Sequence, residues 1–463
     1  MSDSEKGAPK PKFPRTFWTA NSIELFERAA YYSMASFMVI YLHETLGMRP
    51  AFATFLNGSL LWGLIYFLPV LSGTLADKFG FKRSLTVSFI LVSLGYIVMG
   101  NIQRFWPALS GKTGASAIDY TIPAIIGIVL IGVGGSVVKP CIAGTVQKTS
   151  GLRATLGFGI FYMIINIGSM TGRGVSYFIR TNLGIPAIFT YAATIFALIG
   201  LAVVLFLYKE PEYVSDGKKD DQKVQKRTLG QAVLGIFVVF SNLKFVFFLI
   251  FVGLFWFLYV QLYNLMPLFL RYIDPNAPVE IYTLANPVMI VCFQLLITRM
   301  VKKWTPVKSI LFGVGVTTTG MLLNVLPALF LPQLTQRVSL LGLALPAAGI
   351  VLIVSIASMA VGEMMASPRI YEYIGAIAPK GQEGLYLGYA NLPIAIGSFF
   401  GGPLGGRLFE RFISEPTKAG EAINPVAMWL IIAGIGVASL LGLAVYNRVL
   451  VKSRKFGGHD TEF

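Results

Sequence analysis

The stretch KEPEYVSDGKKDDQKVQKRT, residues 209–228, divides the chain into two halves of similar length. It is charged and has almost no large apolar side chains, so it must be solvated. Apolar runs of about 20 residues, the length that crosses roughly 30 Å of hydrocarbon, recur on both sides of it. Six of these runs precede the stretch and six follow it. The sequence therefore predicts an all-α membrane protein with twelve transmembrane helices.

The predicted spans divide the chain into three parts. Residues 1–208 form an N-terminal six-helix unit with a cytoplasmic tail, 209–242 a cytoplasmic linker, and 243–463 a C-terminal six-helix unit with its own tail. Within the linker we expect TLGQAVLGIFVVFSN (228–242) to lie along the membrane surface as an amphipathic helix. The spans run, to within several residues, over roughly 18–43, 52–75, 84–101, 120–146, 154–178, 186–208, 243–272, 280–303, 306–331, 341–373, 383–411 and 425–449.

Composition excludes a soluble protein. Of the 463 residues, 55% are hydrophobic and 13% are charged, and the mean hydropathy is +0.68. A soluble chain of this length could not bury so much apolar surface. We therefore expect an integral protein of the plasma membrane, which in a bacterium is the inner membrane.

The net charge of +16 reflects membrane topology and not nucleic-acid binding. Lysine and arginine gather in alternate loops, beginning with the N-terminal tail and ending with the C-terminal tail. The positive-inside rule then places both termini in the cytoplasm. The N-terminal tail has no separate apolar core, so we expect no cleavable signal peptide and an uncleaved first span.

Enzyme chemistry and cofactors are not expected. Cys141 and Cys292 both lie in apolar runs, which argues against a disulfide framework and a metal site. His43 and His459 are the only histidines, and the chain has no nucleophile elbow or phosphate-binding loop.

Three charges lie inside the first predicted span, in ELFERAAYY (24–32). Each unpaired charge in hydrocarbon costs on the order of 3 kcal/mol by insertion scales. Glu24 and Arg28 stand one helical turn apart, as do Glu27 and Tyr31, so all four share one face. That face must point into the helix bundle.

Other spans carry further polar groups at membrane depth. Lys139, Arg173 and Glu363 bring the buried charges to three of each sign, a balance expected if they neutralise one another around a common cavity. One alternative is that they form structural salt bridges between helices. Six charges spread over several spans favour a solvated transport cavity. The neutral hydrogen-bonding groups at this depth are Tyr66, Tyr162, Asn166, Gln261 and Asn286.

The loop after the second span, GTLADKFGFKR (73–83), resembles the pattern G-x-L-x-D-R/K-x-G-x-R/K-R/K of the major facilitator superfamily. Together with the six-plus-six organisation, this resemblance implies two pseudo-symmetric six-helix bundles. Gly73 and Gly80 allow a tight turn, and Asp77 can cap a helix or pair with a basic neighbour such as Lys82 or Arg83. We interpret these residues as a gating loop. The alternative is a plain basic loop that obeys the positive-inside rule.

The chain is also similar to the proton-coupled oligopeptide transporters. ELFERAAYY resembles their signature E-x-x-E-R-F-x-Y-Y, with Ala29 in place of Phe. Further matching segments follow in the family's order, namely YFLP (66–69), GGSVVKPCI (134–142), FYMIINIGS (161–169), Trp256 to Gln261, Ala285 to Pro287 and GEMMASP (362–368).

The resemblance implies roles for individual residues. Arg28 and Lys139 would serve the peptide carboxylate or its salt-bridge network, and Glu363 would receive the amino group. A zwitterion needs a cation at one end of its cavity and an anion at the other, in agreement with the charges. The expected pocket residues are Tyr32, Tyr66, Tyr162, Asn166, Trp256, Gln261 and Asn286, and the expected proton-coupling or salt-bridge residues are Glu24, Glu27, Arg28, Lys139 and Arg173.

Four positions depart from the family. Ala35 and Val260 stand where the family has an Arg and a Glu that pair with each other, and Ala390 stands where it has a Trp. Arg173 stands where the family usually has Pro. The missing Glu is the one usually tied to proton coupling, so we expect Glu24 or Glu27 to carry the proton. The added cation and the loss of the aromatic side chain at Ala390 suggest a bulkier or more acidic substrate than an ordinary dipeptide.

The expected mechanism is alternating access by a monomer in the lipid bilayer, with a peptide or peptide-like substrate and protons as its partners. Two alternatives remain. One is a proton-driven exporter of a peptide-like metabolite or drug, and the other is a receptor on the same fold that binds its ligand without transporting it.

Overall fold

The computed structural model describes residues 13–106, 120–211, 243–331, 333–340, 343–378 and 383–451, with scattered residues between 230 and 242. Most of the predicted interfacial helix therefore lies outside the described residues. In the described ranges nine helices are long and apolar enough to cross a membrane. Three further long helices carry the polar and glycine-rich segments: α1 (Arg15–Ala35), α10 (Ala154–Leu183) and α21 (Leu392–Phe409). Together they make the predicted twelve.

Several transmembrane helices of the N-terminal half are built from shorter pieces. The first adds α2 (Met38–Ile40) and η2 (Tyr41–Thr45) to α1, and the second joins α3 (Pro50–Thr54), η3 (Phe55–Trp62), α4 (Gly63–Phe67) and α5 (Pro69–Phe79). Next come α6 (Phe81–Gly100), α7 (Ile102–Phe105), α9 (Thr121–Ser150), η4 (Gly151–Arg153), α10, α11 (Ile185–Ala187), η5 (Ile188–Ala193) and α12 (Thr194–Phe206).

The C-terminal half repeats this pattern and adds a β-hairpin. Its elements are α14 (Leu243–Val260), α15 (Leu265–Ile273), α16 (Val279–Val301), α17 (Pro306–Leu323), α18 (Leu326–Phe330), β1 (Arg337–Leu340), β2 (Leu343–Pro346), α19 (Ala347–Ile377), α20 (Glu383–Gly388), α21, η6 (Glu410–Ser414), α22 (Glu415–Ala419), α23 (Pro425–Tyr446) and η7 (Asn447–Val451). The strands pair in antiparallel register from Arg337 opposite Pro346 to Leu340 opposite Leu343. The hairpin corrects the predicted tenth span, which was placed from residue 341; its helix begins at Ala347.

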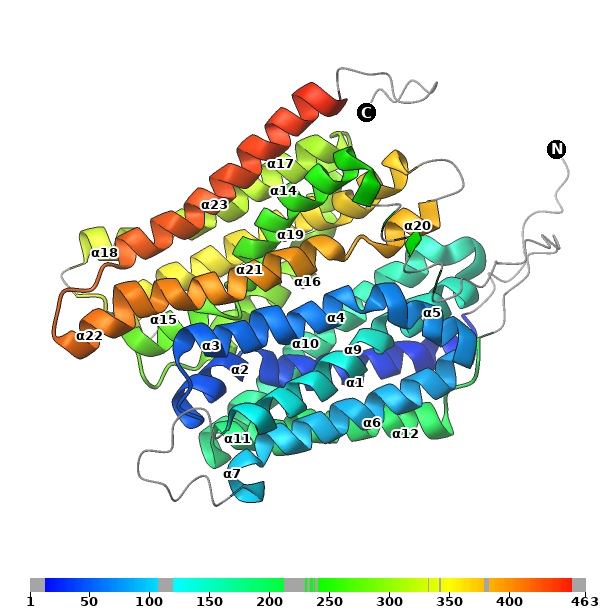
Figure 1. The fold of residues 1–463 in the computed structure, drawn as a ribbon, viewed down its shortest axis with the longest axis horizontal. Helices are drawn as coiled ribbons and strands as arrows, with labels where there is room; N and C mark the ends of the chain where they lie inside the picture. The colour runs from blue at the N-terminus through cyan, green and yellow to red at the C-terminus, as the bar shows by residue number, and fades with distance from the viewer. Residues whose placement is uncertain are drawn as a thin grey trace, which may run out of the picture.

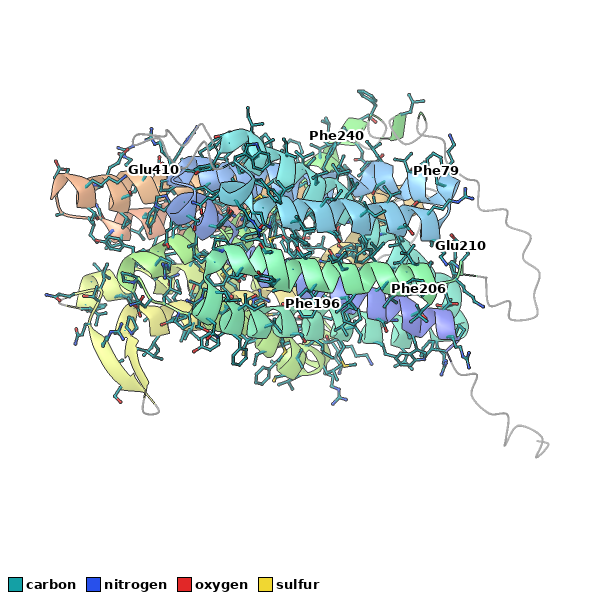
Figure 2. All side chains as sticks on the ribbon, turned by 90° about the horizontal axis from the view of Figure 1, so that it is seen from below. Phe79, Phe196, Phe206, Glu210, Phe240 and Glu410 are labelled. Carbon is teal, nitrogen blue, oxygen red and sulfur yellow. The ribbon has the colours of Figure 1, made fainter. Side chains whose placement is uncertain are left out.

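The helices lie side by side along the long axis of the molecule (Figure 1). We call the end that holds α5 and α20 the proximal end, and the end that holds α7, α18 and α22 the distal end. Phe79 and Glu210 lie at the proximal end and Glu410 at the distal end (Figure 2). Phe206 is 82% exposed on the outside of the bundle, as expected of a side chain that faces lipid.

Each half packs mainly within itself, and two seams join the halves. In the N-terminal half α1 packs against α9, α10 and α12; in the C-terminal half α14 packs against α21, and α19 against α16 and α17. The first seam joins α10 to α16, and the second joins α21 to α3, η3 and α4. These two seams fix how the polar groups of one half face those of the other.

Candidate functional site

The charges of the first span contact one another as the helical spacing predicts. Arg28 Nε lies 3.2 Å from Glu24 Oε1, and it also contacts the carboxylate of Glu27. All three residues are buried, Glu24 completely. One guanidinium is thus shared between two carboxylates. Its central carbon, Cζ, also lies 5.6 Å from the centroid of the Tyr31 ring.

Lys139 connects this cluster to the C-terminal half. It lies on α9 directly before Pro140 and is half-buried. It is close enough for its charge to interact with those of Glu24, Glu27 and Arg28 on α1, and with that of Glu363 on α19. The charged groups of the two halves therefore share one electrostatic neighbourhood.

Glu363 has its own hydrogen-bond partner in the C-terminal half. Asn286 Nδ2 donates to Glu363 Oε2 at 3.3 Å, and the Tyr259 hydroxyl donates to Oδ1 of the same Asn286 at 3.5 Å. Asn286 stands before Pro287 within α16, and Glu363 remains half-buried. A carboxylate held at membrane depth and still in part accessible can accept a hydrogen bond from a cationic group.

Aromatic rings lie between the charges of the two halves. Tyr32 of α1 stands 6.5 Å from Tyr263, measured between ring centroids, and Trp62 of η3 stands 5.1 Å from the same ring. Tyr263 is in turn 6.4 Å from Tyr259, whose hydroxyl donates to Asn286, the hydrogen-bond partner of Glu363. Of these four aromatic residues only Tyr32 was among the predicted site residues.

Partly exposed tyrosines mark the proximal side of the site. Tyr66 and Tyr162 of the N-terminal half and Tyr371 of the C-terminal half lie near one another. Tyr162 and Tyr371 are each 37% exposed. The two halves are therefore less tightly covered here than at the charged cluster of the first span.

Polar contacts close the distal side. Arg49 of the N-terminal half lies 3.5 Å from both Glu410 and Glu415, and Arg271 of the C-terminal half lies 2.6 Å from Glu44. Further from the distal end, Ser36 Oγ lies 2.9 Å from Thr283 Oγ1 beside the first seam, and Asn57 Nδ2 of η3 donates to the Tyr263 carbonyl.

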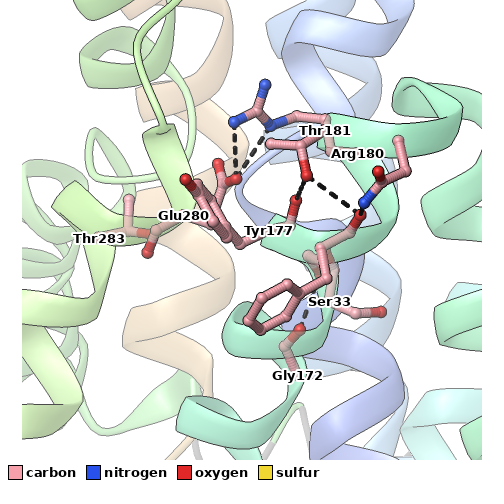
Figure 3. Close-up of polar contacts among 10 residues, drawn as sticks. Ser33, Gly172, Tyr177, Arg180, Thr181, Glu280 and Thr283 are labelled. Carbon is pink, nitrogen blue, oxygen red and sulfur yellow. Dashed lines mark hydrogen bonds and ion pairs between the residues drawn. The ribbon is translucent and has the colours of Figure 1, made fainter.

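The first seam contains a buried ion pair. Both Nε and Nη2 of Arg180, on α10, lie 2.9 Å from Oε1 of Glu280, on α16 (Figure 3). Neither residue was among the predicted site residues. Arg180 lies beyond the end of the predicted fifth span, and Glu280 is the first residue of the predicted eighth span. Charged residues are common at the ends of spans, so the sequence did not indicate a site at either position.

Arg173 differs from its predicted role in a salt bridge. Its guanidinium is 1% exposed and donates to Thr283 Oγ1 at 3.1 Å, to the Tyr263 hydroxyl at 3.0 Å and to Ser169. The guanidinium also stacks over Tyr32 at 4.7 Å. These partners are neutral, so Arg173 ties the first half to the second by hydrogen bonds.

Three predicted pocket residues have mainly packing contacts. Gln261 is fully buried and its Nε2 donates to the carbonyls of Phe257 and Gly401, which joins α14 to α21. Asn166 is 6% exposed and donates to the Tyr162 carbonyl within α10. Trp256 is buried, with its ring 5.1 Å from that of Tyr259. Gln261 is therefore removed from the candidate pocket.

The gating loop has its tight turn at Gly80, where φ is +89°. Glu210 accepts hydrogen bonds from the backbone N–H groups of Phe81 and Lys82 and so caps α6. Lys82 Nζ donates to the Leu205 carbonyl, and Arg83 is exposed. Gly73 lies within α5 and not in the turn, which corrects the prediction for that glycine. The side chain of Asp77 lies outside the described residues.

A metal is not indicated by the donor groups. Across the described ranges, no three or more histidine, cysteine, aspartate or glutamate side chains are grouped to hold a metal ion. The chemistry available at the site is that of paired charges, hydrogen bonds and aromatic faces.

The fold and the paired charges inside it define an integral membrane protein of two helical bundles. The family model of the Major Facilitator Superfamily matches residues 23–352. The chain belongs to that superfamily.

Curated relatives are similar over part of the chain. Dipeptide and tripeptide permease A of Salmonella typhi is 28% identical over 235 residues, which is 50% of this chain and 43% of the permease. The Klebsiella pneumoniae (strain 342) protein of the same name is 34% identical over 162 residues, 34% of this chain and 29% of that one. The matched region thus spans less than half the length of these relatives.

Solved structures are similar in fold over nearly the whole chain. A POT family transporter in complex with 5-aminolevulinic acid has a TM-score of 0.70 and 18% identity, covering 96% of this chain and 97% of its own. A structure titled for substrate recognition in proton dependent oligopeptide transporters has a TM-score of 0.66 and 20% identity, covering 94% and 98%.

Proposed function

We propose that the protein is a secondary active transporter that takes up di- and tripeptides, or a related peptide-like zwitterion, together with protons. One observation carries the proposal: Lys139 in one half and Glu363 in the other are half-buried charges of opposite sign within electrostatic range at membrane depth. Opposite charges placed in the two halves suit a zwitterion that both halves must hold at once. The relatives named as dipeptide and tripeptide permeases support this substrate class.

The proposed pocket lies between the halves. Lys139 and Arg28 would attract the carboxylate end of the substrate, and Glu363, held by Asn286, would accept hydrogen bonds from its amino group. Tyr32 would lie between the two ends. Because the positive charge is on one half and the negative charge on the other, a bound zwitterion links the two.

In this mechanism the halves, residues 1–208 and 243–463, rock about the site as a monomer, while 209–242 connects them. The positive-inside rule places the termini and the proximal end in the cytoplasm and the distal end outside the cell. The closed distal seams and the exposed tyrosines on the proximal side then correspond to a cytoplasm-open state.

The proton would act at the cluster of the first span. Arg28 holds Glu24 and Glu27 together. Adding a proton to either carboxylate removes one of the two attractions that hold the guanidinium. Arg28 is then freer to bind an anionic group on the substrate, which would couple proton and substrate binding.

The test is uptake of labelled di- and tripeptides into liposomes that contain the purified protein, under an imposed inward proton gradient. Accumulation above the external concentration, together with acidification of the lumen, is the expected result. Reversing the gradient separates an importer from an exporter. Specific peptide binding without flux in either direction would contradict the proposal and indicate a receptor.

A further inference from the structure

The ion pair between Arg180 and Glu280 is buried where the two halves meet. Glu280 is fully buried, and the Arg180 side chain is 15% exposed. Both guanidinium contacts use Oε1, so Oε2 of Glu280 has no hydrogen-bond partner among the described residues. A buried carboxylate in this position depends on a single partner from the opposite half.

The pair lies on the distal side of the candidate pocket. Arg173 precedes Arg180 on α10 by seven residues, which is about two helical turns closer to the candidate pocket. Arg173 also forms hydrogen bonds to the opposite half, at Thr283 and Tyr263. On α16, Thr283 stands one turn after Glu280 and accepts from Arg173. The Arg180–Glu280 pair is thus the outer layer of a polar seam, and Arg173–Thr283 is the inner layer.

Opening the distal end must separate this pair. Glu280 would then face water on the distal side without its guanidinium. Removing either charge alone would leave the other buried without a partner in the closed arrangement, and this disfavours that arrangement.

Few other charged groups face Glu280. The charge of Arg271 on α15 acts on it, but Arg271 is itself paired with Glu44. Tyr177 lies beside Arg180 on α10 (Figure 3). The first three turns of α19, residues 347–357, contain no titratable side chain, and Asp274 at the same end is paired with Arg337. Arg180 is the one partner that a rocking motion removes.

We propose that Arg180 and Glu280 form the distal gate of this protein. The proposal rests on the alternating-access function proposed above. It assigns the control of gate opening to α10 and α16, and it makes this ion pair the contact that must break before the distal end opens.

The experiment measures access to the seam with a thiol reporter. Cys141 and Cys292 are replaced, and Ser36→Cys is introduced, because Ser36 is 1% exposed and contacts Thr283 inside the seam. A membrane-impermeant maleimide is applied from the distal side of proteoliposomes, and the labelling rate is compared between Glu280→Gln and the parent. The matched control is Glu44→Gln. It breaks the Arg271–Glu44 ion pair, which also joins the two halves at the distal end but is more exposed to solvent than the Arg180–Glu280 pair.

Glu280→Gln is expected to raise the labelling rate by about tenfold or more, because removing one partner of a buried pair leaves the other charge uncompensated. Glu44→Gln is expected to change it less than about twofold, since exposed pairs contribute little. The charge swap Arg180→Glu with Glu280→Arg should restore the parent rate and also show that a variant at these positions folds.

Two results would overturn the gate. One is a Glu280→Gln labelling rate equal to that of the parent in folded protein, and the other is a charge-swap variant whose labelling rate stays at the level of Glu280→Gln. Gradient-driven peptide uptake is measured in parallel on the parent. Peptide uptake without the labelling changes would contradict the gate and support the proposed transport function. The labelling changes without uptake of any peptide would support the gate and contradict the proposed peptide transport.

Discussion

The second seam is a close backbone contact, and replacing Gly402 by alanine should force it apart. A Cβ atom on Gly402 would lie 2.4 Å from the Thr54 carbonyl oxygen and 2.9 Å from Gly58 Cα. Ordinary contacts of this kind begin at 3.4 Å, so α21 and the end of α3 would have to separate by 3.4 minus 2.4, or 1.0 Å. Forced overpacking of this kind costs about 1–3 kcal/mol.

That cost falls on the distal-closed state, because the contact exists only while the halves meet there. A difference of about 1–3 kcal/mol changes a ratio of populations by roughly 5- to 150-fold. Gly402→Ala should therefore shift the protein toward a distal-open arrangement. The matched control is Gly434→Ala on α23, where an added Cβ has nothing within 4 Å.

The assay is a distance measurement across the distal end. Spin labels at Arg104 and Lys418, both exposed and in opposite halves, report the separation by double electron–electron resonance. Gly402→Ala should increase the longer-distance population, and Gly434→Ala should leave the distribution unchanged. An unchanged distribution in Gly402→Ala, with only a lower melting temperature, would refute the reasoning, because the strain would then have been absorbed within one half.

Four further changes test the site. Glu363→Gln should weaken binding of peptides with a free amino terminus by about tenfold, since a charge-assisted hydrogen bond is lost, and should spare N-acetylated peptides in competition binding. Lys139→Gln should weaken binding of free-carboxylate peptides and spare their amides in the same assay; equal loss for both forms would argue against a carboxylate contact. Gln261→Leu should cost about 0.5–1.5 kcal/mol of stability, because it removes the hydrogen bond that joins α14 to the Gly401 carbonyl of α21, and thermal unfolding should show this with peptide affinity unchanged. Glu27→Gln should abolish proton-driven accumulation while peptide exchange across liposomes continues; full accumulation would exclude Glu27 as the proton carrier.

Local spacing was enough to predict the first-span cluster. Glu24 and Arg28 are four residues apart on one helix, and the structure places them in contact. The twelve spans were also predictable, because apolar length is a property of each segment alone. Such predictions need no knowledge of which helices become neighbours.

The hairpin could not be separated from the tenth span. Residues 337–346 read RVSLLGLALP, and after Arg337 they are almost entirely apolar. A strand exposed on one face usually alternates apolar and polar residues, and this segment does not. Its apolar residues therefore merged with those of the helix that begins at Ala347.

Contacts between the halves were the hardest to predict. Arg180 and Glu280 are 100 residues apart, and neither segment has a sequence feature that predicts contact with the other. Arg173 was expected to balance a carboxylate, but its partners are Thr283, Tyr263 and Ser169, of which only Ser169 is close in sequence. Charge counting predicts that a buried guanidinium needs partners, and only the tertiary arrangement decides whether they are ionic.

The sharing of Arg28 between two carboxylates has a practical consequence for biochemistry on this protein. Glu24, Glu27 and Arg28 carry one positive and two negative charges, and Lys139 supplies the second positive charge of this group. A Lys139→Gln variant would therefore have a net negative cluster that attracts a small cation such as protonated Tris. Binding to that variant should be compared in amine and in phosphate buffer at the same pH.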